Sequence, residues 1–390
     1  MISIKYPTDR TKFESDYLKA LKISQTIEAS FRGLINHRIF TPLKLKFSSL
    51  HNNQTLSLKW LLTADFNDII TLSFEINQCL ENTSFSRTVR KNRKNKLQKI
   101  LNYDVAKGTS YSKLIANFFR DKADELNLSS CYYCNIDYIN TFKDIPYYAK
   151  TIDFVKNATQ KELEKIQDIG PSVATDILGQ KVGITSMDQL TISSKIKDNL
   201  EERLVNRKYD HFTLDHVLNK ANHPLTALSL YNFVPSCYAC NCKFKGSDHL
   251  LKSPQDTYLS PTSSDFTVET AMSFKLLLNG SSLGTITSKS DFDVTVDFPD
   301  GNSKFEDYLS TFKLKGRYSF HKNEALLLIK KKQRYSQSRI EEIARDTGIP
   351  AQKIKEDLYG KELFDGELAT KSLTKYKRDI AKSIGVEGID

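Results

Sequence analysis

The pattern of apolar and polar positions predicts helices over much of the chain. Residues 11–37 carry apolar side chains at helical spacing, which predicts one amphipathic helix. The same spacing over residues 106–126 predicts a second helix, with Ile115, Phe118 and Phe119 on its buried side. From Lys304 onwards the pattern is helical again.

After Pro254 the pattern changes to the alternation of apolar and polar residues that is typical of β-strands. Residues 266–278 and 283–298 alternate in this way, and Asn279-Gly280 between them is typical of a hairpin turn. Helices combined with a few strands predict an α+β fold.

Residues 161–178 predict two short helices joined by a tight turn at Ile169-Gly170-Pro171. This segment resembles a helix-hairpin-helix, which binds the nucleic-acid backbone without reading sequence. We expect Gly170 to let the chain turn, so that amide groups of the second helix face a phosphate. Asp168 stands where such hairpins usually have glycine, and its charge would repel phosphate. The alternative is a packing hairpin that contacts no nucleic acid.

Composition places the chain among globular proteins. Its 390 residues suffice for two or three domains, and 39% are hydrophobic and 27% charged. The net charge of +10 favours polyanionic partners. The first residues include no apolar signal-peptide core, and polar residues interrupt the longest uncharged stretch, residues 221–242. These features predict a cytoplasmic protein with no membrane span.

A run without any acidic residue extends from Ser86 to Lys99. The run includes these cations: Arg87, Arg90, Lys91, Arg93, Lys94, Lys96 and Lys99. It predicts a phosphate-binding stripe, and the alternative is a solvated helix face. A second basic face is predicted around Lys331.

Four of the six cysteines form two C-x-x-C pairs, Cys131/Cys134 and Cys237/Cys240. Two such pairs predict one tetrahedral, structural Zn²⁺ site. The alternatives are a redox pair or structural thiols, and Cys242 is an alternative ligand to Cys240. We expect the remaining Cys79 to lie in a helical core.

The residues between and after these pairs point to a particular chemistry. Asp215-His216 lies in T-L-D-H-V, and Asn232 precedes the second pair, which Asn241 follows directly. Together with the four cysteines, this pattern resembles the zinc-bound form of the HNH, or His-Me finger, nucleases. The resemblance implies a ββα-metal core with a zinc ribbon inside mainly helical flanks.

The resemblance also implies a role for each residue. His216 would be the general base, and Asp215 and Asn241 would ligate one Mg²⁺ or Mn²⁺. Asn232 would orient the imidazole or brace the loop. His223 is a rival base, although His-Pro is typical of a turn, and His211 and His249 are expected on the surface. Two further cations are candidates for phosphate contact: Lys220 and Lys243.

The expected organisation has four parts. A helical region with the basic stripe covers residues 1–105, the nuclease core covers 106–140 and 207–255, and an insertion covers 141–206. Residues 256–390 form a C-terminal hairpin and helices, and this region resembles HNH nucleases of bacterial antiphage systems of the Septu and retron-associated types. That resemblance implies an ATPase partner, since the chain has no P-loop motif.

Three functions are compatible with these motifs. The first is an endonuclease that hydrolyses DNA phosphodiesters in defence against invading DNA. The second is a zinc-ribbon and hairpin module that binds nucleic acid without cutting it. The third is a nuclease that acts on RNA.

Overall fold

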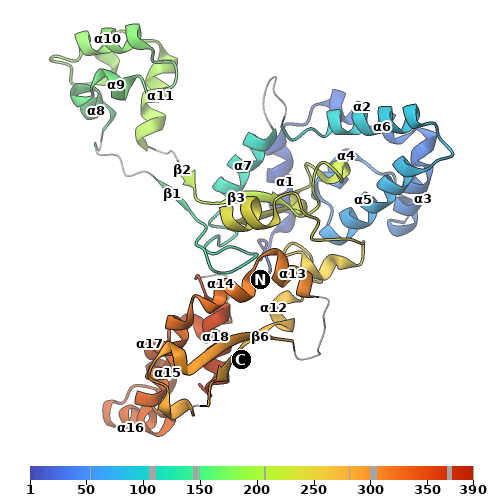
Figure 1. The fold of residues 1–390 in the computed structure, drawn as a ribbon. Coiled ribbons are helices and arrows are strands. Elements are labelled where there is room, and N and C mark those ends of the chain that lie inside the picture. The colour runs from blue at the N-terminus through green and yellow to red at the C-terminus, as the bar shows by residue number, and fades with distance from the viewer. Residues whose placement is uncertain are drawn as a thin grey trace. The chain divides into compact units, whose positions relative to one another are not determined.

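The computed structural model describes residues 1–52, 54–104, 111–143, 148, 150–205, 208–280, 282–298, 305–366 and 371–389, without the side chains of Lys143 and residues 202–205. The chain divides into two compact units, Thr141–His211 and the remainder on both sides of it. Helices predominate in the described part, which also has three two-stranded antiparallel sheets (Figure 1). The predicted α+β class is confirmed at this level.

The N-terminal part of the large unit is helical. Its helices are α1 (Arg10–Leu21), α2 (Gln25–Ile35), α3 (Thr41–Leu50), α4 (Leu58–Thr63), α5 (Phe66–Glu81), α6 (Arg87–Ile100) and α7 (Tyr111–Asp121). The single helix predicted over residues 11–37 is wrong, because α1 ends at Lys22 in the left-handed conformation, with φ 51°. The Ser24 side chain then accepts a hydrogen bond from the Ile27 amide and begins α2.

The helix predicted over residues 106–126 corresponds in part to α7. Ile115, Phe118 and Phe119 are buried on this helix, as predicted. Residues 106–110 lie outside the described residues.

The C-terminal part of the large unit combines one hairpin with several helices. The elements are α12 (Val268–Ala271), β5 (Ser273–Leu278), β6 (Phe292–Asp297), α13 (Glu306–Thr311), α14 (Leu314–Ser319), α15 (Lys322–Arg334), α16 (Gln337–Thr347), α17 (Ala351–Tyr359) and α18 (Thr374–Ser383). Strands β5 and β6 pair from Ser273 with Asp297 to Leu278 with Phe292.

The predicted hairpin therefore exists, but its turn and both strands differ from the prediction, since α12 occupies the start of the first predicted strand. Asn279-Gly280 does not connect the strands directly, because two 3-10 turns at Leu283–Thr285 and Lys289–Asp291 lie between them. The Asp291 carboxylate accepts hydrogen bonds from the Thr287 and Ser288 amides at 2.8 and 2.9 Å. These bonds satisfy the backbone in a turn instead of a sheet.

The small unit, Thr141–His211, begins and ends in one short sheet. Strand β1 (Thr141–Lys143) pairs with β2 (Lys208–Asp210) in antiparallel register. Between them lie α8 (Thr151–Asn157), α9 (Gln160–Leu163), α10 (Pro171–Gln180) and α11 (Ser194–Val205). Their own hydrophobic core includes Leu163, Ile166, Ala174 and Ile177.

The candidate site is built on the remaining sheet, formed by β3 and β4. Strand β3 (Thr213–His216) pairs with β4 (Phe233–Ser236) so that Asp215 faces Val234 and His216 faces Phe233. A short π-helical segment, η5 (Ala239–Lys245), follows β4 and packs against β3. The loop between the strands contains the 3-10 turn η3 (Pro224–Thr226).

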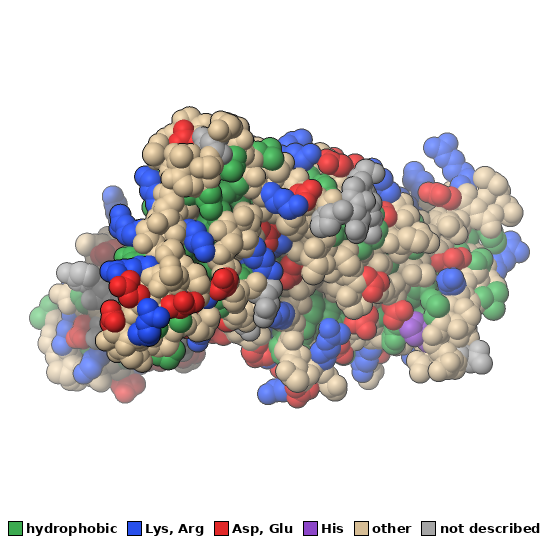
Figure 2. Space-filling model, turned by 90° about the horizontal axis from the view of Figure 1, so that it is seen from below, with side chains coloured by type: hydrophobic (Ala, Val, Ile, Leu, Met, Phe, Trp, Pro, Cys, Tyr) green, Lys and Arg blue, Asp and Glu red, His purple; other side chains and the backbone are tan. Residues whose placement is uncertain are grey.

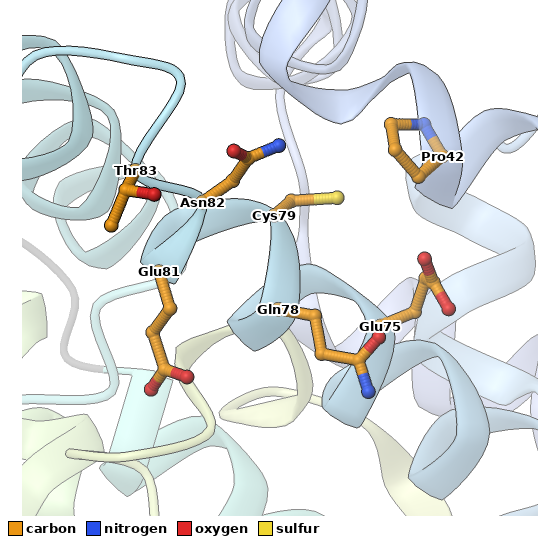
Figure 3. Close-up of a pocket in the computed structure, with 7 residues that line it drawn as sticks. All are labelled: Pro42, Glu75, Gln78, Cys79, Glu81, Asn82 and Thr83. Atoms are coloured by element: carbon orange, nitrogen blue, oxygen red, sulfur yellow. The ribbon is translucent and has the colours of Figure 1, made fainter.

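Cys79 lies on α5 with 2% of its surface exposed, as expected for a core thiol. It borders a pocket of about 460 Å³, where its side chain points toward Pro42 (Figure 3). Burial raises the pKa of the Cys79 thiol and keeps it protonated. The candidate site residues do not line this pocket. In the described part of the chain, every helix is too short or too polar to cross a lipid bilayer.

Candidate metal centre and active site

The four paired cysteines come together in one buried cluster. The Sγ atoms of Cys131, Cys134, Cys237 and Cys240 all lie within 4.8 Å of one another. The Cys134 and Cys237 sulfurs are 4.0 Å apart. Tetrahedral Zn²⁺ with bonds of about 2.3 Å needs sulfurs roughly 3.8 Å apart, so the cluster fits this ion.

Local backbone geometry directs N–H groups at these sulfurs. The Cys237 amide donates to Cys131 Sγ at 3.3 Å, and the Cys240 amide donates to Cys237 Sγ at 3.4 Å. The Ile136 amide donates to Cys134 Sγ at 3.4 Å. Such donors stabilise thiolates, which are the form that binds a metal. Since at most 7% of each cysteine is exposed, the cluster has the closed form of a structural site.

Arg317 of α14 supplies a positive charge to the same cluster. Its guanidinium donates to Cys240 Sγ at 3.2 Å, to Cys134 Sγ at 3.4 Å and to the Asp137 carboxylate at 2.8 Å. Four thiolates and one Zn²⁺ leave two negative charges, which Arg317 offsets in part. No sequence motif singles out this arginine.

The C-terminal part packs around the first cysteine pair through three aromatic residues. The Tyr308 hydroxyl donates to the Tyr133 carbonyl at 2.9 Å, and Phe312 stacks on the Tyr133 ring at 4.5 Å between centroids. The Tyr318 hydroxyl donates to the Cys134 carbonyl. The cysteine cluster is thus part of the contact between the C-terminal part and the β3–β4 hairpin.

Asp215 lies beside this cluster in a buried ion pair. Lys245 Nζ, from the last residue of η5, is 2.9 Å from Asp215 Oδ1, and the side chains are 1% and 4% exposed. The Tyr133 hydroxyl donates to Asp215 Oδ2 at 2.6 Å. Burial raises the pKa of Asp215, whereas Lys245 and Tyr133 counteract this shift. Both oxygens are therefore engaged, which differs from the expected role of Asp215 as a ligand of Mg²⁺ or Mn²⁺.

His216 is held in one tautomer. Its Nε2 lies 3.0 Å from the Ala227 carbonyl oxygen. A carbonyl only accepts hydrogen bonds, so Nε2 carries the proton and Nδ1 keeps a lone pair. Burial lowers the pKa of His216 to about 4, and the nearby Lys220 and Lys245 add to this shift. The imidazole is neutral at pH 7 and can accept a proton at Nδ1.

Aromatic rings fix the plane of this imidazole. The Tyr103 and Phe233 ring centroids each lie 4.7 Å from that of His216. Lys220 contacts the Tyr103 ring and forms an ion pair with Asp104. Lys220 is therefore near His216, as a phosphate contact would require, but its charge is balanced by Asp104.

Asn232 braces the loop between β3 and β4. Its Oδ1 accepts from the Leu218 amide at 2.8 Å, and its Nδ2 donates to the carbonyls of Leu218 and Thr226 at 3.1 and 3.0 Å. The side chain is fully buried. Of the two roles considered for Asn232, these bonds support loop bracing; Thr226 precedes Ala227, the partner of His216.

Asn241 lies on η5 directly after Cys240 and is partly exposed. Its amide nitrogen donates to the Cys237 carbonyl at 3.1 Å, which joins the segment to the second cysteine pair. Among the described residues, its side chain forms no hydrogen bond with Asp215 or His216. The sequence predicted that a metal ion held by Asn241 would contact Asp215. Instead, the ammonium group of Lys245, four residues later on the same segment, contacts this carboxylate.

No protein-family model, curated protein or solved structure matches the chain. The resemblance to HNH nucleases therefore depends on the residues quoted above and on the geometry that they adopt.

The three other histidines considered from the sequence occupy different surroundings. His223 is buried, with Nδ1 2.8 Å from the Ser73 hydroxyl, and burial lowers its pKa to about 4. His249 Nε2 contacts the Asn222 side chain at 2.8 Å. His211, which ends the small unit, is exposed.

The helical hairpin of the small unit has a different turn from the one expected. Gly170 has φ −90°, which any residue adopts, and a Cβ there would meet nothing within 4 Å. The left-handed residue is Asp168, with φ 66°. Its carboxylate is 2.9 Å from Lys195 Nζ and 3.2 Å from the Asn199 amide, which lowers its pKa. Asp168 thus fixes the hairpin onto α11, and the glycine is not required for the turn.

The predicted basic stripe forms α6. Within the described residues, none of the seven cations from Arg87 to Lys99 forms an ion pair. Lys243 is likewise exposed without an ion pair there. By contrast, positive and negative side chains are interspersed on the face shown in Figure 2.

Sequence reasoning missed three residues at this centre: Tyr133, Lys245 and Arg317. Tyr133 lies inside the first cysteine pair, and Lys245 follows the second pair by a few residues, so both were close to recognised motifs. Their role depends on which face of a short element they occupy, and spacing alone does not define this in a π-helical segment.

Proposed function

We propose that the protein is an HNH-type endonuclease that hydrolyses DNA phosphodiesters, with His216 as the general base. The observation that carries the proposal is the hydrogen bond from His216 Nε2 to the Ala227 carbonyl. This bond leaves Nδ1 free to take a proton from the attacking water. A phosphate bound near Lys220 would add negative charge and raise the pKa of His216 from about 4 toward neutral pH.

A divalent cation would neutralise charge on the phosphate in such a reaction. Asp215 does not fit as its ligand in the arrangement described, because Lys245 Nζ is already 2.9 Å from the carboxylate. We therefore derive no step through Mg²⁺ or Mn²⁺. We further propose a defence role with a separate ATPase partner, which is supported by the resemblance of the C-terminal region alone.

The Asp215–Lys245 ion pair favours one alternative function. A site that neutralises its own carboxylate suits a zinc-stabilised module that binds nucleic acid without cutting it. The two functions differ in whether His216 is needed for any chemical step.

Plasmid cleavage separates them. Purified protein would be incubated with supercoiled plasmid DNA, and in parallel with RNA, in Mg²⁺ or Mn²⁺. The proposal expects His216→Ala to abolish DNA cleavage, by a factor of about 10² or more, while His211→Ala cuts like the wild type. Zinc content and circular dichroism would verify that both variants fold.

Two results would count against the proposal. Cleavage by His216→Ala at the wild-type rate would exclude this histidine as the base. Tight DNA binding without cleavage in either metal would favour the binding module, and cleavage of RNA alone would change the substrate class.

A further inference from the structure

The exposed face of α6 has an unusual chemical composition. Its exposed residues are either cations or neutral hydrogen-bonding residues: Arg87, Thr88, Lys91, Asn92, Asn95, Lys96 and Lys99. This face carries no carboxylate and no aromatic ring. Leu97 is buried on the opposite side and attaches the helix to the core.

The charges on α6 oppose the stability of the helix itself. Arg87 and Lys91 are one turn apart, as are Arg90 and Lys94, and like charges at this spacing repel. The first turn carries Arg87 and Arg90 and no acidic residue, although the N-terminal end of a helix favours negative charge. Because none of these cations forms an ion pair within the described part of the chain, the protein does not compensate for this repulsion internally.

The helix is also connected to the candidate active site. It packs against α2, α5 and η3. Ala227, which accepts the hydrogen bond from His216, follows η3 directly. The helix therefore packs directly against the buried turn that borders the loop of the proposed base.

From these observations we propose that α6 is a docking surface for the backbone of duplex DNA. The inference deepens the proposed nuclease function by naming where the substrate is held. The helix is about 20 Å long, and its cations repeat about every 6 Å, so a rigid polyanion can meet several of them at once. Single-stranded nucleic acid is usually held by aromatic stacking, which this face does not offer. Thr88, Asn92 and Asn95 add neutral donors to phosphate and sugar oxygens.

The test measures binding without cleavage. All proteins carry His216→Ala, and a short fluorescein-labelled DNA duplex is titrated without Mg²⁺ or Mn²⁺ across a series of salt concentrations. The α6 variant carries Arg87→Gln, Lys91→Gln and Lys99→Gln. A matched control carries Lys289→Gln, Arg345→Gln and Lys361→Gln, which are exposed and form no ion pair among the described residues.

We expect the α6 variant to bind the duplex at least about tenfold more weakly, with a salt dependence reduced by about 3, since each phosphate contact contributes about 0.9. The control, which loses the same net charge, should retain wild-type binding. The α6 variant should also melt at a higher temperature without DNA, because repulsion within the helix is relieved. This gain verifies folding.

Three results would overturn the proposal. Equal weakening in both variants would show an effect of net charge alone. An unchanged Kd and salt dependence in the α6 variant would exclude α6 as the contact. In parallel titrations with single-stranded DNA, duplex RNA and an acidic protein, stronger α6-dependent binding to any of these would assign the surface to another partner. Because this experiment measures binding and not cleavage, its result does not depend on whether the protein is a nuclease.

Discussion

The four-cysteine cluster and the Asp215–Lys245 pair are both buried, and both depend on the segment from Cys237 to Lys245. The cluster brings four sulfurs within 4.8 Å of one another, so it gathers groups that need a cation. The pair contains its own cation, with Lys245 Nζ 2.9 Å from Asp215 Oδ1. Neighbouring buried sites can thus solve the same problem of charge by binding a metal or by pairing side chains.

The strongest test of this comparison removes a metal ligand. We expect Cys237→Ser to unfold the large unit, because structural zinc contributes apparent binding energies of about 10–16 kcal/mol, as large as the whole stability of a domain. Metal content and urea unfolding would measure the effect. Cys242→Ser is the matched control, since Cys242 is exposed on the same segment and should retain both zinc and stability. A Cys237→Ser protein as stable as the wild type would show that the cluster is not a structural metal site.

The cysteine cluster could be predicted from the sequence because the spacing of the cysteines determines how close their sulfur atoms can lie. A C-x-x-C pair places two sulfurs on one turn whatever surrounds it, so two pairs predict four ligands. The role of Asn232 as a loop brace was likewise among the predictions, and its partners Leu218 and Thr226 both lie in the loop between β3 and β4. Local patterns sufficed in both cases.

The environment of Asp215 could not be predicted in this way. Its two side-chain partners come from distant places in the chain, and Lys245 reaches it from the end of the π-helical segment η5. Tyr133 reaches it from the first cysteine turn. Similarly, the single helix expected over residues 11–37 failed at Lys22, where one left-handed residue and the Ser24 cap outweighed the apolar spacing.

The second test removes the internal cation. We expect Lys245→Met to lower the free energy of unfolding by about 3–5 kcal/mol, because Asp215 is then buried without a counterion. The double variant Lys245→Met, Asp215→Asn should lose less, since the amide needs no counterion and still accepts a hydrogen bond from Tyr133. Urea unfolding measures both. The control is Lys375→Met, which breaks another buried ion pair, Lys375–Asp379 in α18, away from the hairpin.

This experiment also bears on the metal. If Lys245→Met were as stable as the wild type only when Mg²⁺ or Mn²⁺ is present, Asp215 would be shown to accept a divalent cation in place of the ammonium group. If the loss were the same with and without these ions, the pair would be structural.

The smallest expected effect is a dependence on pH at His216. Burial lowers the pKa of His216 to about 4 from an ordinary value of 6.5, so the unfolded state binds more protons between these pH values. Stability should therefore fall as the pH decreases from 6.5 to 4, with a contribution of at most about 1.4 kcal/mol per pH unit from one histidine. His223, with a pKa of about 4, contributes in the same direction.

Comparing how the free energy of unfolding of two variants depends on pH separates the contribution of His216 from those of His223 and the cysteine cluster. We expect His216→Gln, whose amide can still donate to the Ala227 carbonyl, to lose stability less steeply than the wild type below pH 6.5. His211→Gln, at an exposed position, should follow the wild-type curve. Urea unfolding at several pH values gives the slopes, and NMR titration of the imidazole gives the pKa directly. Parallel curves for wild type and His216→Gln would mean that His216 is solvated and charged at mildly acidic pH. The lone pair on Nδ1 would then be lost in that range, and with it the physical basis for treating this histidine as a base.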